Sequence, residues 1–248
     1  VLTAATPMVE DMALLRLLQL TSPALPVGGY SYSEGLETLS QQGQLPDGAA
    51  LEGWLIHELA YGTVRVEATM VLKVHQAVTQ GNPAAIAQWN RYLSALRDTE
   101  ELRQQNWQMG QSLRQLLLNL ESDFGPLLQP LQPCNFAIAF AVAAAHWDVS
   151  EKNSVLGYLY SWTTTLVNAG IKLVPLGQTA GQQLQQRLHP KLIETTTWVL
   201  SAPDSWWDWT YAEATPASGP ETSPQICSWG VSLASMGHEA LYSRLFRS

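Results

Sequence analysis

Charge is scarce in this sequence. Only 14% of its 248 residues are Asp, Glu, Lys or Arg, whereas about a quarter is usual for soluble domains, and 46% are hydrophobic. A chain of this length buries a large core, but its polar surface must come mainly from Gln, Ser, Thr and Asn. The shortage of charge indicates that subunit or partner interfaces cover part of the exterior. The net charge is −8 and no basic run occurs, so we expect no nucleic-acid partner.

Cysteine is nearly absent, since Cys134 and Cys227 are the only two. Two widely separated thiols form no disulfide framework and fit a reducing compartment. The first residues lack a basic region followed by an apolar run and a small-residue cleavage site, so we predict a cytoplasmic protein without a secretion signal. Residues 153–171 carry no charge and are long enough to span a bilayer. Their Asn, Ser and Thr side chains favour a buried helix instead, and we expect no membrane contact.

Complete motifs of common enzymes are also missing. A phosphate-binding Walker loop needs a lysine after its glycines, and neither 28–35 nor 177–181 supplies one. Residues 29–33 are similar to a nucleophile elbow, but Ser33 stands where the last glycine is required. Paired carboxylates that could act as general acid and base are scarce. Glu100-Glu101 stands at a predicted helix start, where the favourable interaction of acidic side chains with the helix dipole explains the presence of both residues. We therefore predict no catalytic residues.

The histidines are dispersed along the chain. His238-Glu239 begins like a zinc-protease helix, but Tyr242 stands where the second histidine would be. Structural histidines are the simpler interpretation, and we predict no resident metal or cofactor. A metal site built by tertiary folding, or by one histidine repeated across a symmetric dimer, stays an alternative. The five histidines, none within four residues of another or of a cysteine, are His57, His75, His146, His189 and His238.

Apolar residues recur at helical spacing, and no long alternating β-branched run occurs. The sequence therefore predicts an all-α fold, a single helical bundle of about nine or ten helices. Asp47 and Asn82 are expected helix N-caps, Ser33 is expected to cap a short helix, and Gly43 to end it. The alanine-rich helix over 135–147 is expected at the bundle centre. The predicted helices cover about 8–20, 33–42, 49–61, 64–79, 83–97, 99–120, 135–147, 153–173, 178–188 and 191–200.

The last third of the chain changes in composition. We predict a helical bundle domain over 1–202, a flexible segment over 203–226 rich in Pro and Ser, and a carboxyl-terminal docking tail over 227–248. The tail carries Met236, Leu241 and Phe246, which are strongly apolar for a chain end. Such a tail either folds back onto its own bundle or docks onto another protein.

The segment 22–37 connects the first two predicted helices and is apolar rather than polar. Two prolines fix φ and remove two donors, and two adjacent glycines permit unusual backbone conformations. Tyrosines and serines alternate after them. A loop of this composition either packs under the fold or forms a contact surface, and the residues favour the two interpretations about equally.

Four blocks of sequence occur in the order found in one known family. The first block consists of four short pieces, 17–20, 22–28, 31–33 and 35–37. The second is Met109-Gly110, which follows the polar stretch 103–105. The third is 172–178 together with 181–182, and the fourth is 235–248. On these blocks the chain resembles the urease accessory protein UreF family over nearly its whole length. Gly237 departs from the family pattern, in which alanine or a larger residue is expected, and 203–225 contains no motif to match.

The resemblance implies an all-helical, homodimeric chaperone that is not an enzyme. Such proteins join the accessory protein UreD (also called UreH) and the GTPase UreG on apo-urease. The assembly supports GTP-dependent insertion of nickel, with carbon dioxide for lysine carbamylation, into the urease active site. Two alternatives remain open from the sequence: a helical metal-dependent hydrolase, suggested by the histidines and by His238-Glu239, and a helical adaptor unrelated to urease.

The resemblance also suggests three sets of partner-binding residues. In the set expected to contact UreD, Arg244 would be a polar anchor and Phe246 an apolar one. Each set has a purely structural alternative: Tyr32 belongs to the core, Arg244 caps its own helix, or Gln178 satisfies backbone groups near Pro175. The set expected to contact UreD is Ser235, Met236, His238, Glu239, Leu241, Tyr242, Arg244, Leu245 and Phe246; that expected near UreG or the dimer is Tyr32, Ser33, Glu34 and Glu37; the third is Lys172, Gln178 and Gln182.

Overall fold

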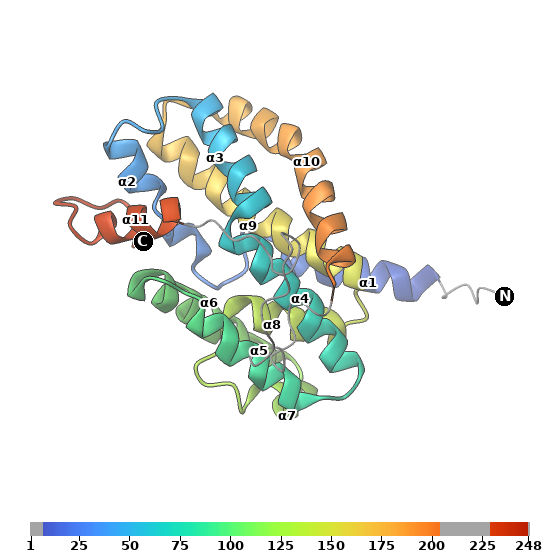
Figure 1. The fold of residues 1–248 in the computed structure, drawn as a ribbon. Coiled ribbons are helices and arrows are strands. Elements are labelled where there is room, and N and C mark those ends of the chain that lie inside the picture. Colours follow the sequence, from blue (N-terminus) through green and yellow to red (C-terminus); the bar gives the residue numbers. More distant parts are fainter. Residues whose placement is uncertain (1–6, 204–228, 248) are drawn as a thin grey trace, which may run out of the picture.

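The computed structural model describes residues 7–203 and 229–247, and all the regular structure in these residues is helical, as predicted. Apart from Pro203, the predicted flexible segment 203–226 lies outside the described residues. The α-helices are α1 (Pro7–Leu20), α2 (Leu36–Gln41), α3 (Gly48–Tyr61), α4 (Thr63–Thr79), α5 (Pro83–Ala95), α6 (Glu100–Leu120), α7 (Gly125–Leu128), α8 (Phe136–His146), α9 (Glu151–Leu173), α10 (Gln178–Ser201) and α11 (Trp229–His238), with 3-10 turns at Gly29–Ser31 and Ser122–Phe124 (Figure 1).

The alanine-rich helix α8 lies at the centre of the fold, as predicted. Every residue from Phe136 to Ala144 is buried, and α8 packs most extensively against α4 and also against α6 and α9. Small side chains allow these helices to approach one another closely. None of the described helices is long and apolar enough to cross a lipid bilayer.

Several helix boundaries follow the capping chemistry of the sequence. Asp47, Asn82 and Thr99 accept backbone N–H groups in the first turns of α3, α5 and α6, which confirms the two predicted caps Asp47 and Asn82. Gly43 adopts a left-handed φ of 72°, as expected after a helix end. The prediction that Ser33 caps α2 is wrong. Left-handed residues at Glu34 (φ 49°) and Gly35 (φ 86°) delay the helix until Leu36.

The prediction of two separate helices over 178–188 and 191–200 is wrong, because α10 is one helix that runs through Pro190. The missing N–H of Pro190 removes one hydrogen bond of the helix. Leu188, Leu192 and Val199 nevertheless lie on one buried face, and α10 packs along α9 and α3. Continuous burial of that face outweighs the local preference of proline for a helix start.

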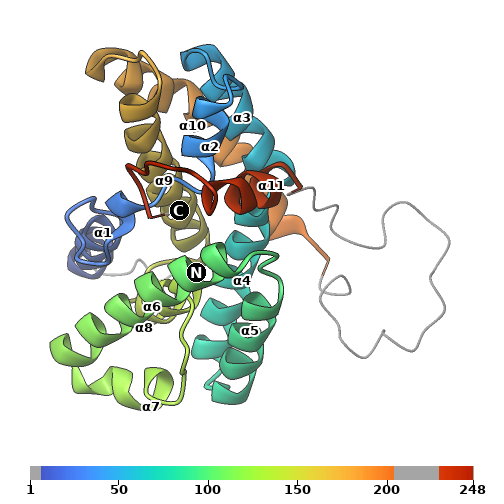
Figure 2. The same cartoon turned by 90° about the vertical axis from the view of Figure 1, so that its left-hand side faces the viewer.

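Residues 229–247, which we call the tail, lie across the bundle rather than beside it. Figure 2 shows α11 and the final residues between α2 on one side and α6 on the other, and α11 contacts both helices. Ala234 and Phe246 join a hydrophobic cluster built from α2, α3, α9 and α10. A larger cluster around α4 and α8 forms the other part of the core. The tail thus belongs to the packed core of the single domain.

Candidate functional site

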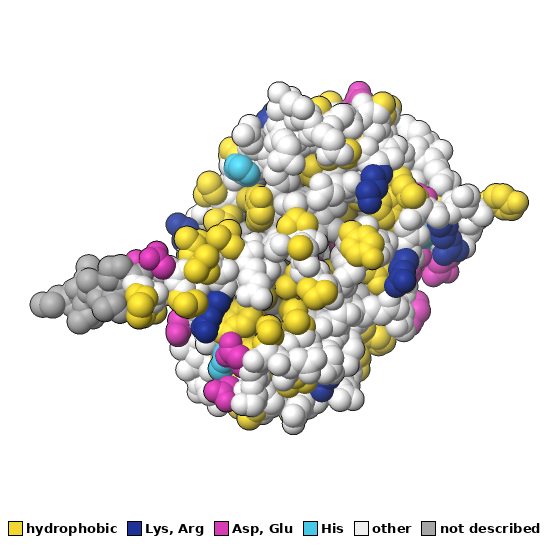
Figure 3. All heavy atoms as spheres, turned by 180° about the vertical axis from the view of Figure 1, so that it is seen from behind, with side chains coloured by type: hydrophobic (Ala, Val, Ile, Leu, Met, Phe, Trp, Pro, Cys, Tyr) yellow, Lys and Arg dark blue, Asp and Glu magenta, His cyan; other side chains and the backbone are white. Residues whose placement is uncertain are grey.

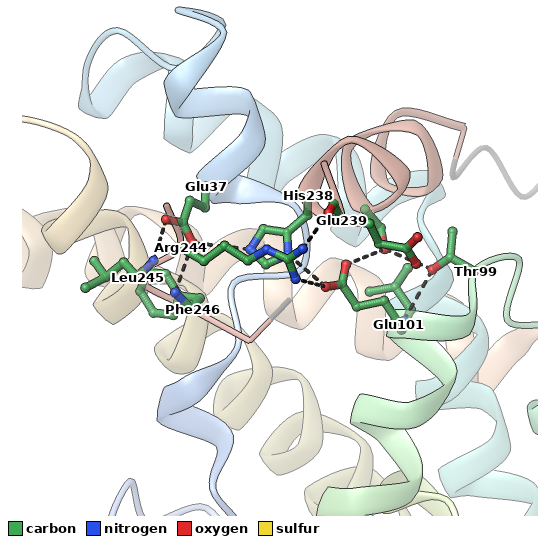
Figure 4. Close-up of polar contacts among 10 residues, drawn as sticks. Glu37, Thr99, Glu101, His238, Glu239, Arg244, Leu245 and Phe246 are labelled. Carbon is green, nitrogen blue, oxygen red and sulfur yellow. Dashed lines mark hydrogen bonds and ion pairs between the residues drawn. The ribbon is translucent and has the colours of Figure 1, made fainter. Parts of the chain in front are cut away.

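The tail is bound by its own bundle through a buried histidine, His238, at the end of α11. Its ring is fully buried, with Nδ1 2.7 Å from Oε1 of Glu101 and Nε2 3.3 Å from Oε2 of Glu37 (Figure 4). A ring with an N–H on each nitrogen donates to both carboxylates. The ring of His238 therefore lies between the carboxylates of α6 and α2 and links α11 to both helices.

Glu37 holds the end of the tail as well. Its carboxylate accepts the backbone N–H groups of Leu245 at 2.6 Å and of Phe246 at 2.9 Å (Figure 4). A buried carboxylate is stable only when donors of this kind replace water. The ring of Phe246 is buried as well, and Nζ of Lys172 lies 5.4 Å from its centroid. Phe246 therefore anchors the tail to its own bundle.

Side chains at and just before the start of α6 fix the rest of α11. The hydroxyls of Ser235 and Thr99 lie 2.9 Å apart, and Ser232 donates to Asp98. Arg244 donates to the carbonyl of Glu239, just beyond α11, and its guanidinium lies 3.9 Å from Glu101. The geometry of Arg244 thus fits the interpretation that it caps its own helix end.

The opposite side of the tail faces outward. Ser235, His238 and Phe246 are buried in the bundle, but Tyr242 is fully exposed and Leu245 is 63% exposed. The tail therefore separates its predicted partner-binding residues into two groups. Those that are exposed or partly exposed are Met236, Glu239, Leu241, Tyr242, Arg244 and Leu245.

The segment 28–35, which we call the opening loop, exposes Tyr30 but packs its second half under the fold. Tyr32 is only 5% exposed and donates its hydroxyl to Oε1 of Gln108 at 2.7 Å, and Ser33 is also buried. The expectation that Tyr32 is presented at a surface is therefore corrected, because its ring fills the space beside α6. Glu34 is half-buried and accepts the indole N–H of Trp162 at 3.0 Å.

A charged cluster beneath the opening loop was not predicted. Glu67 of α4 accepts hydrogen bonds from Arg97, from Asn106 and from the hydroxyl of Tyr158. Burial raises the pKa of the nearby Glu34 carboxyl, although the charge of Arg97 opposes that shift. One signal in the sequence was available: Glu67 interrupts a run of residues that are otherwise mostly apolar in α4.

Two small cavities lie beside this cluster. The inner one, of about 40 Å³, is lined by the charged cluster and by Tyr32 and Glu34. The outer one, of about 70 Å³, extends toward Lys172. Both are bounded by Gly29 and Met109, so the opening loop forms a wall of each.

The third predicted set is divided in space. Lys172 is exposed beside the tail, through Phe246. Gln178 begins α10 and Gln182 follows one turn later, and both are exposed. Of this set, only Lys172 has a described contact with the tail.

Metal chemistry has little support in the described residues. Within 7–203 and 229–247, no group of three or more His, Cys, Asp or Glu side chains could hold a metal ion. The ring nitrogens of His238, the histidine that suggested a hydrolase, both face carboxylates of the bundle.

The outer side of the tail is one apolar surface, and a second lies on the face of the molecule that is turned away from the viewer in Figure 1. Figure 3 shows hydrophobic side chains gathered across that face. Along α1, the exposed residues are Met8, Val9, Met12, Leu14, Leu15 and Leu18. A cleft of about 430 Å³ adjoins them, lined by residues of α1, α9 and α10 that include Leu156, Tyr160 and Ile193.

Fold and site together define an all-helical protein whose chain end is clamped across its bundle and which exposes two apolar surfaces. The UreF family model matches residues 45–189, and the chain belongs to the UreF family. The prediction of the family is thereby confirmed, and the alternative of an adaptor unrelated to urease is wrong.

Curated relatives match nearly the full chain. The urease accessory protein UreF of Nostoc sp. is 46% identical over 244 residues, which cover 98% of this chain and 99% of the relative. The urease accessory protein UreF of Trichormus variabilis is 47% identical over 239 residues, covering 96% and 97%. That of Cupriavidus necator is 36% identical over 238 residues, covering 95% and 97%. These relatives support a role in urease maturation.

Proposed function

We propose that this chain is a urease maturation chaperone that assembles with UreD/UreH and UreG on apo-urease and supports GTP-dependent nickel insertion. Nickel is the cargo of this assembly, and no resident metal is assigned to the chain. The observation that carries the proposal is the two-sided tail. Its inner side is anchored by buried hydrogen bonds, and its outer side offers apolar residues to a partner.

The outer face of the tail is the proposed contact for UreD/UreH. Leu233, Met236, Tyr242 and Leu245 are large apolar or aromatic residues that remain exposed although the tail itself is ordered on the bundle. Interfaces are enriched in such residues, and a pre-organised surface loses less conformational entropy on binding than a free tail. Phe246 supports this surface from below instead of contacting the partner.

Co-purification with UreD/UreH tests this contact. Tyr242→Asp and Leu245→Asp place charge on the outer face without touching the buried anchors, so we expect each to abolish capture of UreD/UreH. The helical circular dichroism signal should be unchanged. Ile56→Asp changes another exposed apolar residue on α3 and serves as the matched control. Normal capture by both outer-face variants would contradict the proposal.

The apolar face of α1 is the proposed surface for homodimer formation. An exposed ridge, including Leu15 and Leu18, lies beside an apolar cleft on the same face. In a two-fold dimer one patch meets itself, so a ridge and a groove that share a face can complement each other across the axis. We expect Leu15→Glu to convert a dimer to a monomer in sedimentation-velocity experiments, whereas Ile56→Glu should leave it a dimer. A dimer that survives Leu15→Glu would place the contact elsewhere.

Activation of urease tests the function as a whole. Apo-urease incubated with UreD/UreH, UreG, GTP, nickel and bicarbonate should gain ureolytic activity when this chain is added. Tyr242→Asp should lower that gain to the level measured without the chain, because the assembly would lack its UreD/UreH contact. Equal activation with and without the chain would overturn the proposed function.

A further inference from the structure

The opening loop separates three hollow regions of the molecule. It bounds the inner cavity through Tyr32 and Glu34, and the outer cavity through Gly29 and Tyr30. Its other side borders a surface cleft of about 490 Å³ that is lined by Tyr32 and Gly28. Movement of this one segment would therefore connect the interior to the outside.

The inner cavity has the chemistry of a hydrated site. Arg97 is 7% exposed, and its Nε has no hydrogen-bond acceptor in the part of the chain that the structure describes. The carboxylates of Glu34 and Glu67 line the same cavity. A cavity needs roughly 10–15 Å³ for one water molecule, so a cavity of about 40 Å³ accommodates water or a similarly small polar solute.

The opening loop is bounded by residues suited to act as hinges. Gly28 and Gly35 have φ values of 76° and 86°, in the left-handed region that glycine adopts without steric cost. Between them, the loop is held to the bundle chiefly by side chains, such as the bond from Tyr32 to Gln108. A rotation at the two glycines can therefore move the loop without distorting α1 or α2.

The tail holds this loop in place at its middle and at its second glycine. The backbone N–H of Arg247 donates to the carbonyl of Ser31 in the middle of the loop, at 2.8 Å. Gly35 lies so close to α11 that an added Cβ would come 2.8 Å from the Cβ of Ala234. Glu37, two residues further on, accepts the N–H groups of Leu245 and Phe246.

The tail also reaches the mouth of the outer cavity. Lys172 lines that cavity, and its Nζ lies over the ring of Phe246. The aromatic face attracts the ammonium group and so restrains its position. Detachment of Phe246 would free Lys172 at the same time as the loop.

We propose that the tail is a latch that closes the inner polar cavity beneath the opening loop. With the tail docked, the loop is pinned and small polar solutes are excluded from that cavity. With the tail released, the loop pivots at Gly28 and Gly35, and the inner cavity opens to solution. The latch goes beyond the proposed function, because docking of a partner on the outer face of the tail does not require it.

Cysteine accessibility tests the latch. Leu166→Cys places a thiol in the wall of the inner cavity, at a position that is 1% exposed while the tail is docked. Burial raises the pKa of the native Cys134 thiol to about 12, so this residue stays unreactive, and Cys227→Ser removes the other thiol. The rate of alkylation by iodoacetamide is then measured with and without Glu37→Ala, which removes the acceptor of His238 and of the chain end. We expect labelling at least tenfold faster in the Glu37→Ala background.

A milder variant keeps the test valid if Glu37→Ala fails to fold. At Gly237, an added Cβ would come 2.9 Å from Cγ2 of the buried Thr38, so Gly237→Ala should loosen the tail without removing charge. Its labelling rate should lie between those of the parent and Glu37→Ala. Thr197→Cys on the exposed side of α10 is the control, and its rate should be the same in every background.

The outcome separates the latch from partner docking. Tyr242→Asp changes only the outer face of the tail, so it should leave the labelling of Leu166→Cys at the parent rate even if it abolishes capture of UreD/UreH. Labelling at the parent rate in both Glu37→Ala and Gly237→Ala would overturn the latch.

Discussion

Glu37 illustrates how much of this molecule depends on single buried polar groups. One carboxylate contacts the ring of His238 and receives two backbone N–H groups from the chain end. Removing one partner of such a group leaves the others without a bond, which costs about 1–3 kcal/mol per neutral group and more for a charged one. At this scale, the side chains that fix the tail are the inner ones, and those that we propose as partner contacts are the outer ones.

A second buried carboxyl predicts an unusual dependence of stability on pH. Burial raises the pKa of Glu58 to about 8, with a smaller contribution from the charge of Glu34. An unfolded glutamate has a pKa of about 4.3, so the folded state retains a proton that the unfolded state loses. The contribution of protonated Glu58 to the free energy of unfolding is therefore fully present below the pKa of the unfolded glutamate. It decreases above that pH and is lost as the pH rises through about 8.

Glu58→Gln removes this titration while keeping the size of the side chain. We expect the variant to gain stability over the parent as the pH rises from about 5 to about 8, by at most about 1.4 kcal/mol per pH unit. Thermal unfolding followed by circular dichroism at several pH values measures the effect. Glu194→Gln, at an exposed position, should run parallel to the parent. A Glu58→Gln curve that also runs parallel would contradict the prediction.

Residues whose role is local could be predicted from the sequence, and those whose role is tertiary could not. Asp47 and Asn82 cap helices that begin beside them, so neighbouring residues suffice to identify them. Glu101 stands at a helix start and was explained by the helix dipole. Its bond to His238 joins residues separated by 137 positions, and no local pattern encodes such a pairing.

At the scale of helices, α10 shows packing prevailing over propensity. Proline inside a helix costs about 3 kcal/mol relative to alanine. The sequence therefore predicts a break at Pro190. The buried face of α10 continues on both sides of that residue, which explains why the helix does not break there.

Pro190→Ala distinguishes one continuous helix from two. In a continuous helix the new N–H can donate to the carbonyl of Gln186, so we expect stabilisation by about 1–3 kcal/mol. The midpoint of thermal unfolding should rise by roughly 2–4 °C for each kcal/mol. If Pro190 instead occupied the first turn of a separate helix, alanine would be neutral or destabilising, and that result would contradict the continuous helix.

Most helices could be predicted because their apolar residues recur at helical spacing and their ends carry recognisable breakers. The end of α1 before Pro23 and the central position of α8 are examples. The delayed start of α2 could not be predicted. It depends on left-handed backbone at Glu34, and that conformation accompanies a bond from Trp162 on α9, a contact distant in sequence.

For the whole molecule, the tail is part of the core, and its removal should be costly. A chain ending at residue 228 would expose the cluster that Phe246 and Ala234 complete. Deleting a buried phenylalanine side chain alone costs about 3–5 kcal/mol, so the midpoint of thermal unfolding should fall by roughly 10 °C. The remaining helices should persist in circular dichroism. An unchanged midpoint would show that the tail contributes little to the core.

The low charge of the sequence predicted extensive apolar or neutral surfaces, and the structure places two of them, on α1 and on the tail. Their positions could not be predicted, because composition does not reveal which face of a helix the rest of the fold covers. The tail illustrates this point: its sequence was compatible both with folding back and with docking. The structure shows it folded back, with its outer residues still exposed.

The bond between Glu37 and Phe246 has a consequence for the order in which the molecule folds. It joins residues separated by 209 positions, and contacts so distant in sequence form slowly because a long loop must close first. Helices that follow one another directly, such as α3 and α4, can pack before that loop closes. We therefore expect the outer face of the tail to take shape late in folding, after the bundle on which it lies.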